Sequence, residues 1–359
     1  MTPNRWVCVI AVLRSGQLES GMIESVQFNN LKALRDTTLQ LGRFTLIVGP
    51  NGSGKSTALW ALRAAGDPSL LDFNRAATAG LVVDNSTTVE VALRWGSPHD
   101  GATTFARWST SAQNHWHTFK QELSGDLVKS LSDELDNTLS AIRIYSFDAP
   151  SIAAPTSLEP QVTLGSNGRN LAVVLDQLRD SDPERFEALN EELGRWLPEF
   201  ERILFDTPFG GQKSFLLRTR RGRHKIQASE LSQGTLIALA ILTLAYIPHP
   251  PPIVCFEEPD RGIHPRLLRD IRDAIYRLSY PENHGEKRDP VQVIATTHSP
   301  YFLDLYKDHP EEVVIADKVG QEVRFERLSD RADIDEILGD TQLGDAWYSG
   351  VLGGVPSHP

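Results

Sequence analysis

The stretch FTLIVGPNGSGKSTALWAL, residues 44–62, decides the fold of this chain. It begins with a continuous apolar run, residues 44–48, which is typical of a strand buried in a parallel sheet. A glycine-rich loop follows, and residues 55–65 then predict a helix that ends at Gly66. A buried strand, a glycine-rich loop and a helix in this order bring backbone N–H groups and a helix N-terminus together, which predicts an anion site.

The loop itself, GPNGSGKST at residues 49–57, fits the pattern G-x-x-x-x-G-K-[ST] of nucleotide-binding loops. Its backbone N–H groups are expected to surround the phosphates of ATP. Lys55 is expected to reach the β- and γ-phosphates, and the Ser56 hydroxyl to bind Mg²⁺. The predicted nucleotide-binding residues of this loop are Asn51, Gly52, Ser53, Gly54, Lys55, Ser56 and Thr57.

Two adjacent carboxylates follow a second apolar run, in IVCFEEPDRGIHP at residues 253–265. Residues 253–256 predict another buried strand, which we expect beside the strand 44–48. The acidic residue that ends such a strand in ATPases with this phosphate loop holds Mg²⁺, so Glu257 is the predicted metal ligand. Glu258 is then the predicted base that orients the attacking water.

Two further segments carry candidate site residues. LSQGT, residues 231–235, opens a long apolar helix, with Ser232 as a natural N-cap and Gly234 leaving the backbone open to a phosphate. IATTHSP, residues 294–300, ends an apolar strand next to His298. Each segment alone is typical of an ordinary helix start or of a structural histidine.

Together the four segments resemble an ABC-type ATPase, with Walker A at 49–57, the signature at 231–235, Walker B at 253–258 and the switch histidine at 298. The segments MIESVQFNNLKALRDTTL, LSQGT, EEPDRGIHP and ATTHSPYFLD resemble more narrowly the stand-alone AAA-family ATPases of the RecF/SMC/OLD-like group. This resemblance implies an α/β P-loop fold of ABC-ATPase type, with a mixed sheet, an antiparallel β subdomain and a helical signature lobe.

The resemblance also implies a mechanism. Such heads bind ATP and Mg²⁺ and dimerise head to tail around two ATP molecules. Ser232 and Gly234 of one subunit then contact the γ-phosphate held by the other subunit, and His298 contacts that phosphate within its own chain. Residues 259–264 correspond to the D-loop at the dimer seam. A helix N-terminus facing developing negative charge agrees with this arrangement.

The chain departs from the family pattern at three points. Glu257 stands where an aspartate is commoner. The metal-binding glutamine of the family is not assigned, and Gln161 is the candidate for it. The aromatic residue that stacks on adenine is not assigned either, and Phe28 is the candidate.

The composition is that of a globular chain, with 40% hydrophobic and 23% charged residues and a net charge of −11. This charge does not indicate a general nucleic-acid binder. The cysteines, Cys8 and Cys255, are too few for a disulfide framework or a zinc site, which fits the reducing cytoplasm. The longest apolar run, residues 235–247, is shorter than the roughly 17–25 residues that span a bilayer, so it predicts a core helix and no membrane span.

The expected organisation is an extension over residues 1–21, with no signal-peptide pattern, and one ATPase head over 22–359. The head divides into a Walker A and β lobe (22–150), a helical lobe (151–245), a Walker B and histidine core (246–330) and a tail (331–359). The segments outside the motifs predict strands within 22–41, an antiparallel β region over 80–120, helices at 121–140, 170–179, 183–197 and 265–278, strands at 141–147 and 291–296, a loop over 150–168 and a hairpin turning near Gly222.

Three observations bear on partners. The basic cluster RTRRGRHK, with Arg218, Arg220, Arg221, Arg223 and Lys225, would project on the hairpin and contact nucleic acid, an acidic partner or only solvent. The H-x-H at 115–117 lacks an evident third metal ligand. The chain shows no sustained heptads between 57 and 231 and too few residues after His298 for a Toprim domain, so neither a coiled-coil arm nor a nuclease of its own is expected.

Three functions fit these patterns. The first is an ATPase whose dimer closure regulates a separate effector or acts on nucleic acid, and the resemblance implies a setting in bacterial defence or DNA maintenance. The second is a scaffold that binds ATP to assemble with a partner protein and does not hydrolyse it appreciably. The third is the ATPase subunit of a transporter, which the segments 22–41 and 257–265 do not fit.

Overall fold

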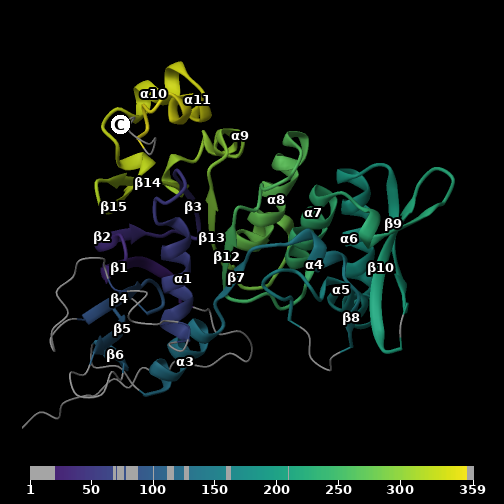
Figure 1. Ribbon diagram of the computed structural model, residues 1–359, viewed down its shortest axis with the longest axis horizontal. Coiled ribbons are helices and arrows are strands. Elements are labelled where there is room, and N and C mark those ends of the chain that lie inside the picture. The colour runs from purple at the N-terminus through teal and green to yellow at the C-terminus, as the bar shows by residue number, and fades with distance from the viewer. Residues whose placement is uncertain are drawn as a thin grey trace, which may run out of the picture.

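The computed structural model describes residues 21–67, 70, 77, 88–99, 101–110, 117–124, 129–158, 163–208 and 210–353. Two sheets enclose a helix in one half of this part of the chain, and a lobe of helices with a smaller sheet forms the other half (Figure 1). The combination of a mixed sheet, an antiparallel β subdomain and a helical lobe confirms the predicted fold class.

The central sheet has six strands in the order β15-β14-β3-β13-β12-β7, parallel except for β15. All residues of β3 and β13 are buried, as their uninterrupted apolar sequences predict. Because the parallel strands share a direction, their carboxyl ends meet at one edge, here called the carboxyl edge, which is the upper edge in Figure 1. The strands are β3 (Phe44–Val48), β7 (Arg143–Tyr145), β12 (Ile253–Glu257), β13 (Gln292–Thr297), β14 (Val313–Val319) and β15 (Glu322–Arg327).

The expected pairing of the strand 253–256 with the strand 44–48 is wrong. The strand β13 lies between them, with Val293 opposite Phe44 on one side and Gln292 opposite Ile253 on the other. The two motif strands are therefore two strand spacings apart, about 10 Å. All three sequences are uniformly apolar, so nothing in their pattern determines which strands are neighbours.

The helix α1 (Lys55–Gly66) lies between the central sheet and the antiparallel sheet. Its side chains are buried on most faces, and they share one core with strands of both sheets. A side-chain amide also ties the sheets together, because Gln292 of β13 accepts from the amide of Ile23 at 2.9 Å and donates to its carbonyl at 2.7 Å. The helix that follows the phosphate loop is thus fixed on both sides.

The antiparallel sheet has the order β2-β1-β4-β5-β6, which confirms the predicted two-strand start and β region where residues are described. The first turn lies at 32–33, after Asn29 and Asn30, because Leu31 pairs with Leu34. The strand β6 continues to Ser124, so the helix predicted over 121–140 begins only at Lys129. The elements are β1 (Ile23–Leu31), β2 (Leu34–Gln40), β4 (Thr88–Trp95), β5 (Thr103–Thr110), β6 (His117–Ser124) and α3 (Lys129–Ser140).

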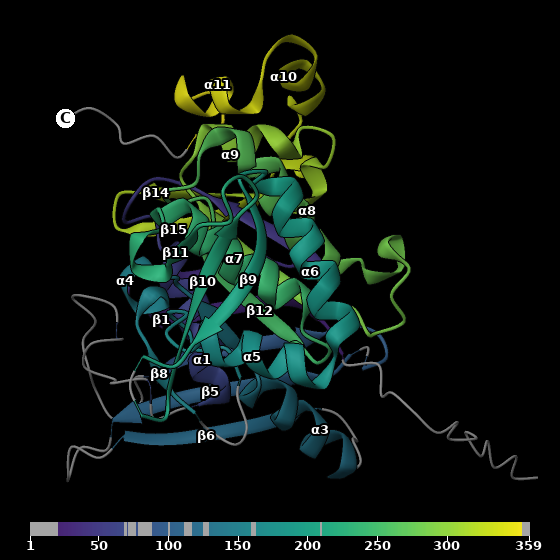
Figure 2. The ribbon, with the colours of Figure 1, turned by 90° about the vertical axis from the view of Figure 1, so that its right-hand side faces the viewer.

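The helical lobe is built around α7, whose residues 235–246 are all buried. This helix is apolar on every side, and no helix in the described ranges is both long and apolar enough to cross a membrane. Figure 2 shows α5, α6, β9 and β10 in front of it. The lobe contains α4 (Ala149–Ala153), β8 (Thr156–Ser157), α5 (Leu171–Ser181), α6 (Pro183–Trp196), β9 (Phe200–Asp206), β10 (Gln212–Thr219), β11 (Lys225–Gln227), η2 (Ala228–Glu230) and α7 (Gln233–Tyr246).

Local capping signals explain most of these boundaries. Asp182 accepts from the amide of Arg185 at 3.1 Å and caps α6, one turn before its apolar face begins. The loop predicted over 150–168 is wrong in part, because Asp148 caps the short helix α4 in the same way at 2.9 Å. The sequence Asp-Ala-Pro carried that signal, with proline in the first turn.

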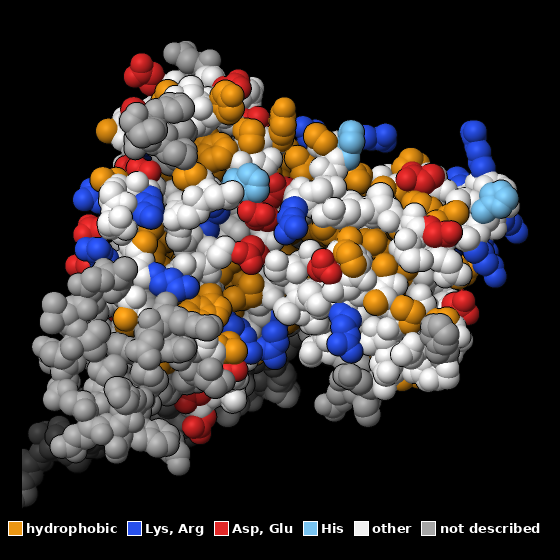
Figure 3. Space-filling model, in the orientation of Figure 1, with side chains coloured by type: hydrophobic (Ala, Val, Ile, Leu, Met, Phe, Trp, Pro, Cys, Tyr) orange, Lys and Arg blue, Asp and Glu red, His pale blue; other side chains and the backbone are white. Residues whose placement is uncertain are grey.

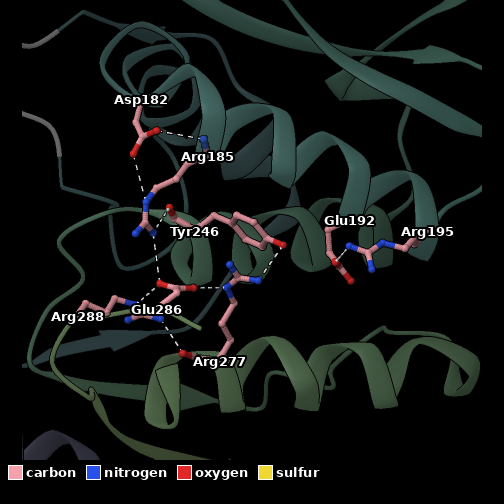
Figure 4. A network of polar contacts seen from close by, with 8 residues as sticks. All are labelled: Asp182, Arg185, Glu192, Arg195, Tyr246, Arg277, Glu286 and Arg288. Atoms are coloured by element: carbon pink, nitrogen blue, oxygen red, sulfur yellow. Dashed lines mark hydrogen bonds and ion pairs between the residues drawn. The ribbon is translucent and has the colours of Figure 1, made fainter. Parts of the chain in front are cut away.

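A buried glutamate holds the helical lobe to the core (Figure 4). Glu286, which precedes β13, forms ion pairs with Arg277 of α8 (Leu268–Ser279) at 2.5 Å, with Arg288 at 2.7 Å and with Arg185 of α6 at 3.4 Å. The guanidinium of Arg277 also lies 4.1 Å from the ring centre of Tyr246, at the end of α7. Burial raises the pKa of Glu286, but the bonds and charges of Arg288 and Arg277 lower it more, and the net shift is below the ordinary value.

We expect Glu286→Gln to lower the free energy of unfolding by about 3 kcal/mol, because it leaves the buried guanidinium of Arg288 and the half-buried ones of Arg277 and Arg185 without their counter-charge. Urea denaturation at pH 7 measures this. The folded-state pKa is lowered, so the stabilisation is complete above the ordinary glutamate pKa and is lost as the pH falls through the lowered value. The control is Glu282→Gln, whose pair with Arg43 is exposed, and its effect is expected to stay below about 1 kcal/mol. An equal loss of unfolding free energy in the two variants would contradict the role of Glu286 in holding the helical lobe to the core.

A C-terminal extension, described over residues 331–353, packs on the carboxyl edge (Figure 2). Its helices are α10 (Ile334–Asp340) and α11 (Leu343–Tyr348), and α11 contacts α9 (Pro300–Leu303). The amide of Gly344 donates to Asp304 at 2.7 Å, and Leu343 is fully buried. The remaining short turns are η3 (Pro265–Leu267), η4 (Pro281–His284), η5 (Asp304–Tyr306), η6 (Pro310–Glu312) and η7 (Leu328–Asp330).

Candidate nucleotide-binding site

The phosphate loop, residues 49–54, connects β3 to α1 in a conformation that needs its glycines. Gly52 and Gly54 have φ angles of 82° and 84°, in the left-handed region that side chains disfavour. At Gly49 a Cβ atom would lie 2.4 Å from the carbonyl oxygen of Ala316 and 2.6 Å from the Ser53 hydroxyl. The loop is therefore pressed against β14, a constraint that the motif alone does not show.

The start of α1 presents unpaired donors. The first bond within the helix runs from the amide of Ala58 to the carbonyl of Gly54 at 2.9 Å, so the amides of residues 55–57 have no partner inside the helix. The N-cap residue Gly54 offers no side-chain acceptor. The Ser53 hydroxyl is buried without a hydrogen-bond partner among the described residues. These free donors around one loop fit a phosphate group.

Lys55 is buried, with 6% of its surface exposed, and its amine donates to the carbonyls of Gly49 at 2.7 Å and Pro50 at 2.9 Å. Burial lowers the pKa of Lys55, and the carboxylates of Glu258 and Glu257 raise it in part. Both glutamates, two hundred positions away in the sequence, thus lie close enough to act on this amine. The sequence predicts that the phosphate loop and the two carboxylates come together at one site, and in the structure they lie close together.

Glu257 ends β12 and accepts a short hydrogen bond from the Ser56 hydroxyl. A hydroxyl and a carboxylate oxygen at one point are ligands that Mg²⁺ prefers. Two protein ligands are few, but Mg²⁺ is commonly held by one or two carboxylates together with water and substrate phosphates. The pair Ser56 and Glu257 therefore fits a nucleotide-bound Mg²⁺.

Glu258 has a positive φ of 50°, which is uncommon for a residue with a side chain. Such backbone conformations cluster at active sites and ligand-binding sites. Its amide donates to the carbonyl of Thr296 at 3.1 Å, which holds this bend against β13. Its Oε1 lies 2.8 Å from Nδ1 of His298. The structure thus joins the predicted base and the predicted switch histidine directly, although 40 positions separate them.

A cavity of about 310 Å³ lies in front of these groups, at the lower end of the range for ligand pockets. Sequence reasoning missed the turn between β1 and β2, which forms one wall of it. Lys32 in that turn has φ 50° and lies 5.2 Å above the ring of Trp60 on α1, but only the tertiary structure brings it to the loop. The lining residues are Lys32, Ala33, Leu34, Asn51, Gly52, Ser53, Gly54, Lys55, Ser56, Thr57 and Glu258.

The prediction that Phe28 stacks on adenine is wrong. Its ring is fully buried in β1 and packs against Phe325, with ring centres 6.3 Å apart. Alternation along a strand identifies which side chains share a face, but it does not say what that face contacts. The face of β1 that carries Phe28 packs in the hydrophobic core. Gln161 and the first two residues of the H-x-H lie outside the described residues, and of His117 only the backbone is described.

The signature residues lie outside this cavity. Ser232 is exposed and caps α7, accepting from the amide of Thr235 at 3.1 Å. Gly234 has a packing reason that the sequence did not reveal, because a Cβ there would lie 2.8 Å from the carbonyl of Gly262. The start of α7 therefore abuts the D-loop, and neither signature residue lines the cavity of its own chain.

The D-loop, residues 259–264, is anchored next to His298. Thr297 donates its hydroxyl hydrogen to Asp260 at 3.0 Å. Burial raises the pKa of Asp260, and the bond from Thr297 lowers it in part. One end of this segment thus depends on the end of β13, and Gly262 near its other end contacts α7.

The basic cluster divides into paired and unpaired residues. Arg218 forms an ion pair with Glu201 at 2.6 Å, and Arg220 donates to the carbonyl of Pro198 at 3.1 Å. Arg221, Arg223 and Lys225 are exposed and form no ion pair with a described residue. The predicted basic surface is therefore narrower than the sequence suggests.

Comparison with known proteins agrees with this geometry. Residues 105–304, more than half of the chain, match the family described as "AAA domain, putative AbiEii toxin, Type IV TA system", and residues 22–92 match an "AAA ATPase domain". The OLD nuclease of Thermus scotoductus (strain ATCC 700910 / SA-01) is 22% identical over 90% of this chain and 68% of its own length. Structural maintenance of chromosomes protein 5 of Arabidopsis thaliana is 30% identical, over 27% of this chain and 10% of its own length.

The fold is also that of a solved SMC head. The SMC head bound to the C-terminal winged-helix domain of ScpA matches with a TM-score of 0.59 at 16% identity, over 88% of this chain and 99% of that chain. The predicted resemblance is thereby confirmed. The likeness to the OLD nuclease and to the SMC head agrees with the predicted resemblance to ABC-type ATPases of the RecF/SMC/OLD group, and the chain belongs to the ATPase family described as "AAA domain, putative AbiEii toxin, Type IV TA system".

Proposed function

We propose that residues 22–359 act as one ATPase head that dimerises head to tail around ATP, and that closure of this dimer regulates a separate effector or acts on nucleic acid. One observation carries the proposal. The cavity of the chain contains the phosphate loop and Glu258 but no signature residue, while Ser232 is exposed at the start of α7 on the same carboxyl edge. A second copy, turned by a two-fold axis, supplies what the cavity lacks.

Within one copy, the loop residues 51–57 bind the phosphates through backbone amides and the Lys55 amine. Ser56 and Glu257 hold Mg²⁺, which neutralises phosphate charge when bound. Glu258 accepts a proton from the attacking water and aims it, and His298 fixes the carboxylate of Glu258 through their 2.8 Å contact. In the dimer, His298 also contacts the terminal phosphate.

From the other copy, Ser232 and the N-terminus of α7 face the same phosphate. The Ser232 hydroxyl donates to a phosphate oxygen, and the positive end of the helix stabilises the charge that develops there. Gly234 contributes indirectly, because it lets α7 lie against the D-loop of its own chain.

The setting that we propose is defence or DNA maintenance in the bacterial cytoplasm. The matched family description names a type IV toxin–antitoxin system, and the similar proteins are an OLD nuclease and a chromosome-maintenance protein. The similar SMC head is bound to a domain of ScpA, so a head of this fold does engage a separate protein. These relatives support an effector that binds the closed dimer.

The test compares wild type with Ser232→Arg by measuring ATP turnover, ATP binding and mass in solution. Wild type is expected to hydrolyse ATP and to double its mass with ATPγS and Mg²⁺. The variant is expected to bind ATP as a monomer but to lose both dimer formation and turnover, because the arginine projects into the second copy. Ser140→Arg, exposed at the end of α3 and away from the carboxyl edge, is the control.

Two results would contradict the proposal. Turnover by Ser232→Arg at the wild-type rate would show that the signature does not serve a second copy. Wild-type turnover at the background rate, with ATP-dependent assembly retained, would favour the scaffold.

A further inference from the structure

Three exposed cations lie in and beside the turn between β10 and β11. Arg221 and Arg223 of the turn and Lys225 at the start of β11 form no ion pair with any described residue, whereas Arg218, which lies opposite Lys225 on β10, is paired. Figure 3 shows basic side chains gathered at the upper right, over the turn that follows β10. The basic turn, residues 220–225, therefore offers net positive charge that its own chain leaves uncompensated.

Three exposed anions lie on the C-terminal extension. Asp335 and Glu336 stand in the first turn of α10 and Asp345 in the first turn of α11, and none pairs with a residue that the structure describes. Asp333, by contrast, is paired with Arg331 at 2.9 Å. Separate acidic side chains are visible near these helices at the upper left of Figure 3, with hydrophobic side chains between them.

The extension also carries exposed aromatic surface. Tyr348 on α11 is 81% exposed, and Tyr301 on the adjoining helix α9 is 65% exposed. Amphipathic tyrosines on an exposed surface are typical of protein interfaces. Tyr301 follows His298 by three positions, so this surface is continuous with the proposed dimer face.

The two charged groups stand at opposite ends of one edge. In Figure 1 the extension rises at the upper left, on the side of α1, and the hairpin turn lies at the upper right, beyond α7. A two-fold axis along the viewing direction of Figure 1 places the phosphate loop of one copy opposite the signature of the other. The same rotation carries the extension of each copy to the side on which the basic turn of the other lies.

We propose that the C-terminal extension of one copy binds the basic turn of a second copy, so that opposite charges clamp the ATP-bound dimer from outside the nucleotide sites. The inference rests on the proposed head-to-tail dimer. Charge complementarity selects a second copy as the occupant, because each copy carries both partners and the symmetry makes the contact twice. A nucleic acid as ligand of the basic turn is the competing outcome.

The test exchanges the charges. One variant carries Arg221→Glu and Arg223→Glu, and the other carries Asp335→Lys and Glu336→Lys. Alone, each places like charges together twice, so each dimer is expected to be weaker than wild type by about tenfold or more at low salt. Mixed in equal amounts, the two variants meet with opposite charges at both contacts. The mixture is therefore expected to form a heterodimer close to wild-type affinity, measured by sedimentation with ATPγS and Mg²⁺.

Two single changes give a matched control. Lys225→Glu is expected to weaken the dimer, whereas Lys287→Glu is not, because Lys287 is exposed near the opposite edge, in the segment before β13. Thermal unfolding checks that every variant is folded. Asp345→Lys with Lys225→Glu forms a second exchange pair if one of the double variants does not fold.

The outcomes separate this inference from the function on which it rests. If wild type forms no dimer with ATPγS, both the charge clamp and the proposed head-to-tail dimer are contradicted. If wild type dimerises and the reversed variants dimerise equally well, or if mixing does not restore affinity, only the clamp falls. If the basic-turn variant dimerises normally but no longer binds a DNA or RNA oligonucleotide that wild type binds, nucleic acid replaces the second copy as the ligand of the turn.

Discussion

Glu258→Gln is expected to bind ATP as tightly as wild type and to hydrolyse it about 10²–10⁴-fold more slowly. The glutamine keeps the size of the side chain and an oxygen for the 2.8 Å contact with His298, but it cannot accept a proton from water. The bend at Glu258, with φ 50°, depends on its backbone bond to Thr296 and is therefore retained. ATP-bound dimers are expected to accumulate, because closure is no longer followed by hydrolysis.

Single-turnover hydrolysis and equilibrium binding of ATP measure the two halves of this prediction. The control is Glu322→Gln on β15, whose exposed pair with Arg35 lies outside the cavity, and its turnover is expected to equal that of wild type. A Glu258→Gln protein with wild-type turnover would remove Glu258 from the chemistry and make another group the base.

Lys55→Ala is expected to weaken ATP binding by about 100-fold or more and thereby to abolish turnover at ordinary ATP concentrations. The amine is the one cation among the described residues of the phosphate loop and α1 start, and it already lies within hydrogen-bond distance of Gly49 and Pro50. A bound phosphate competes with these carbonyls for the amine. Without the amine, the buried loop meets polyphosphate with amide donors alone.

Isothermal titration with ATP and Mg²⁺ measures the loss. Lys32→Ala is the matched control, because Lys32 lines the same cavity but belongs to the turn between β1 and β2, and its amine lies over the ring of Trp60. Its effect on affinity is expected to be smaller than that of Lys55→Ala. Equal losses in both variants would indicate a general effect of positive charge in the cavity and contradict a specific role for Lys55.

Most of the candidate nucleotide-binding site could be predicted because its motifs are unbroken runs of residues in the sequence. The phosphate loop is a single run of residues between a strand and a helix, and its chemistry follows from that local order. Ser232 caps α7 as its position before an apolar helix predicts. The carboxylates end a buried strand, and the shared direction of parallel strands then brings Glu257 to Ser56.

Other features depend on contacts that no local pattern encodes. The insertion of β13 between β3 and β12, the wall formed by Lys32 and the burial of Phe28 all follow from how distant strands pair. Gly234 illustrates the same limit, because the sequence explains it by an approaching phosphate while the structure shows the carbonyl of Gly262. The docking of the extension on α9 had no signal in the acidic sequence of the tail.

The contact between α7 and the D-loop brings backbone against backbone, because a Cβ atom at Gly234 would lie 2.8 Å from the carbonyl oxygen of Gly262, and the side chain of Gln233 packs over Gly262. The other end of the D-loop is held by Thr297, next to His298. In the proposed dimer, a shift of His298 on loss of the terminal phosphate would therefore be passed to the start of α7, which serves the nucleotide of the other site. The two nucleotide sites of the proposed dimer would then hydrolyse ATP together. The rate of hydrolysis would depend on ATP concentration along a sigmoidal curve that is steeper than a hyperbola.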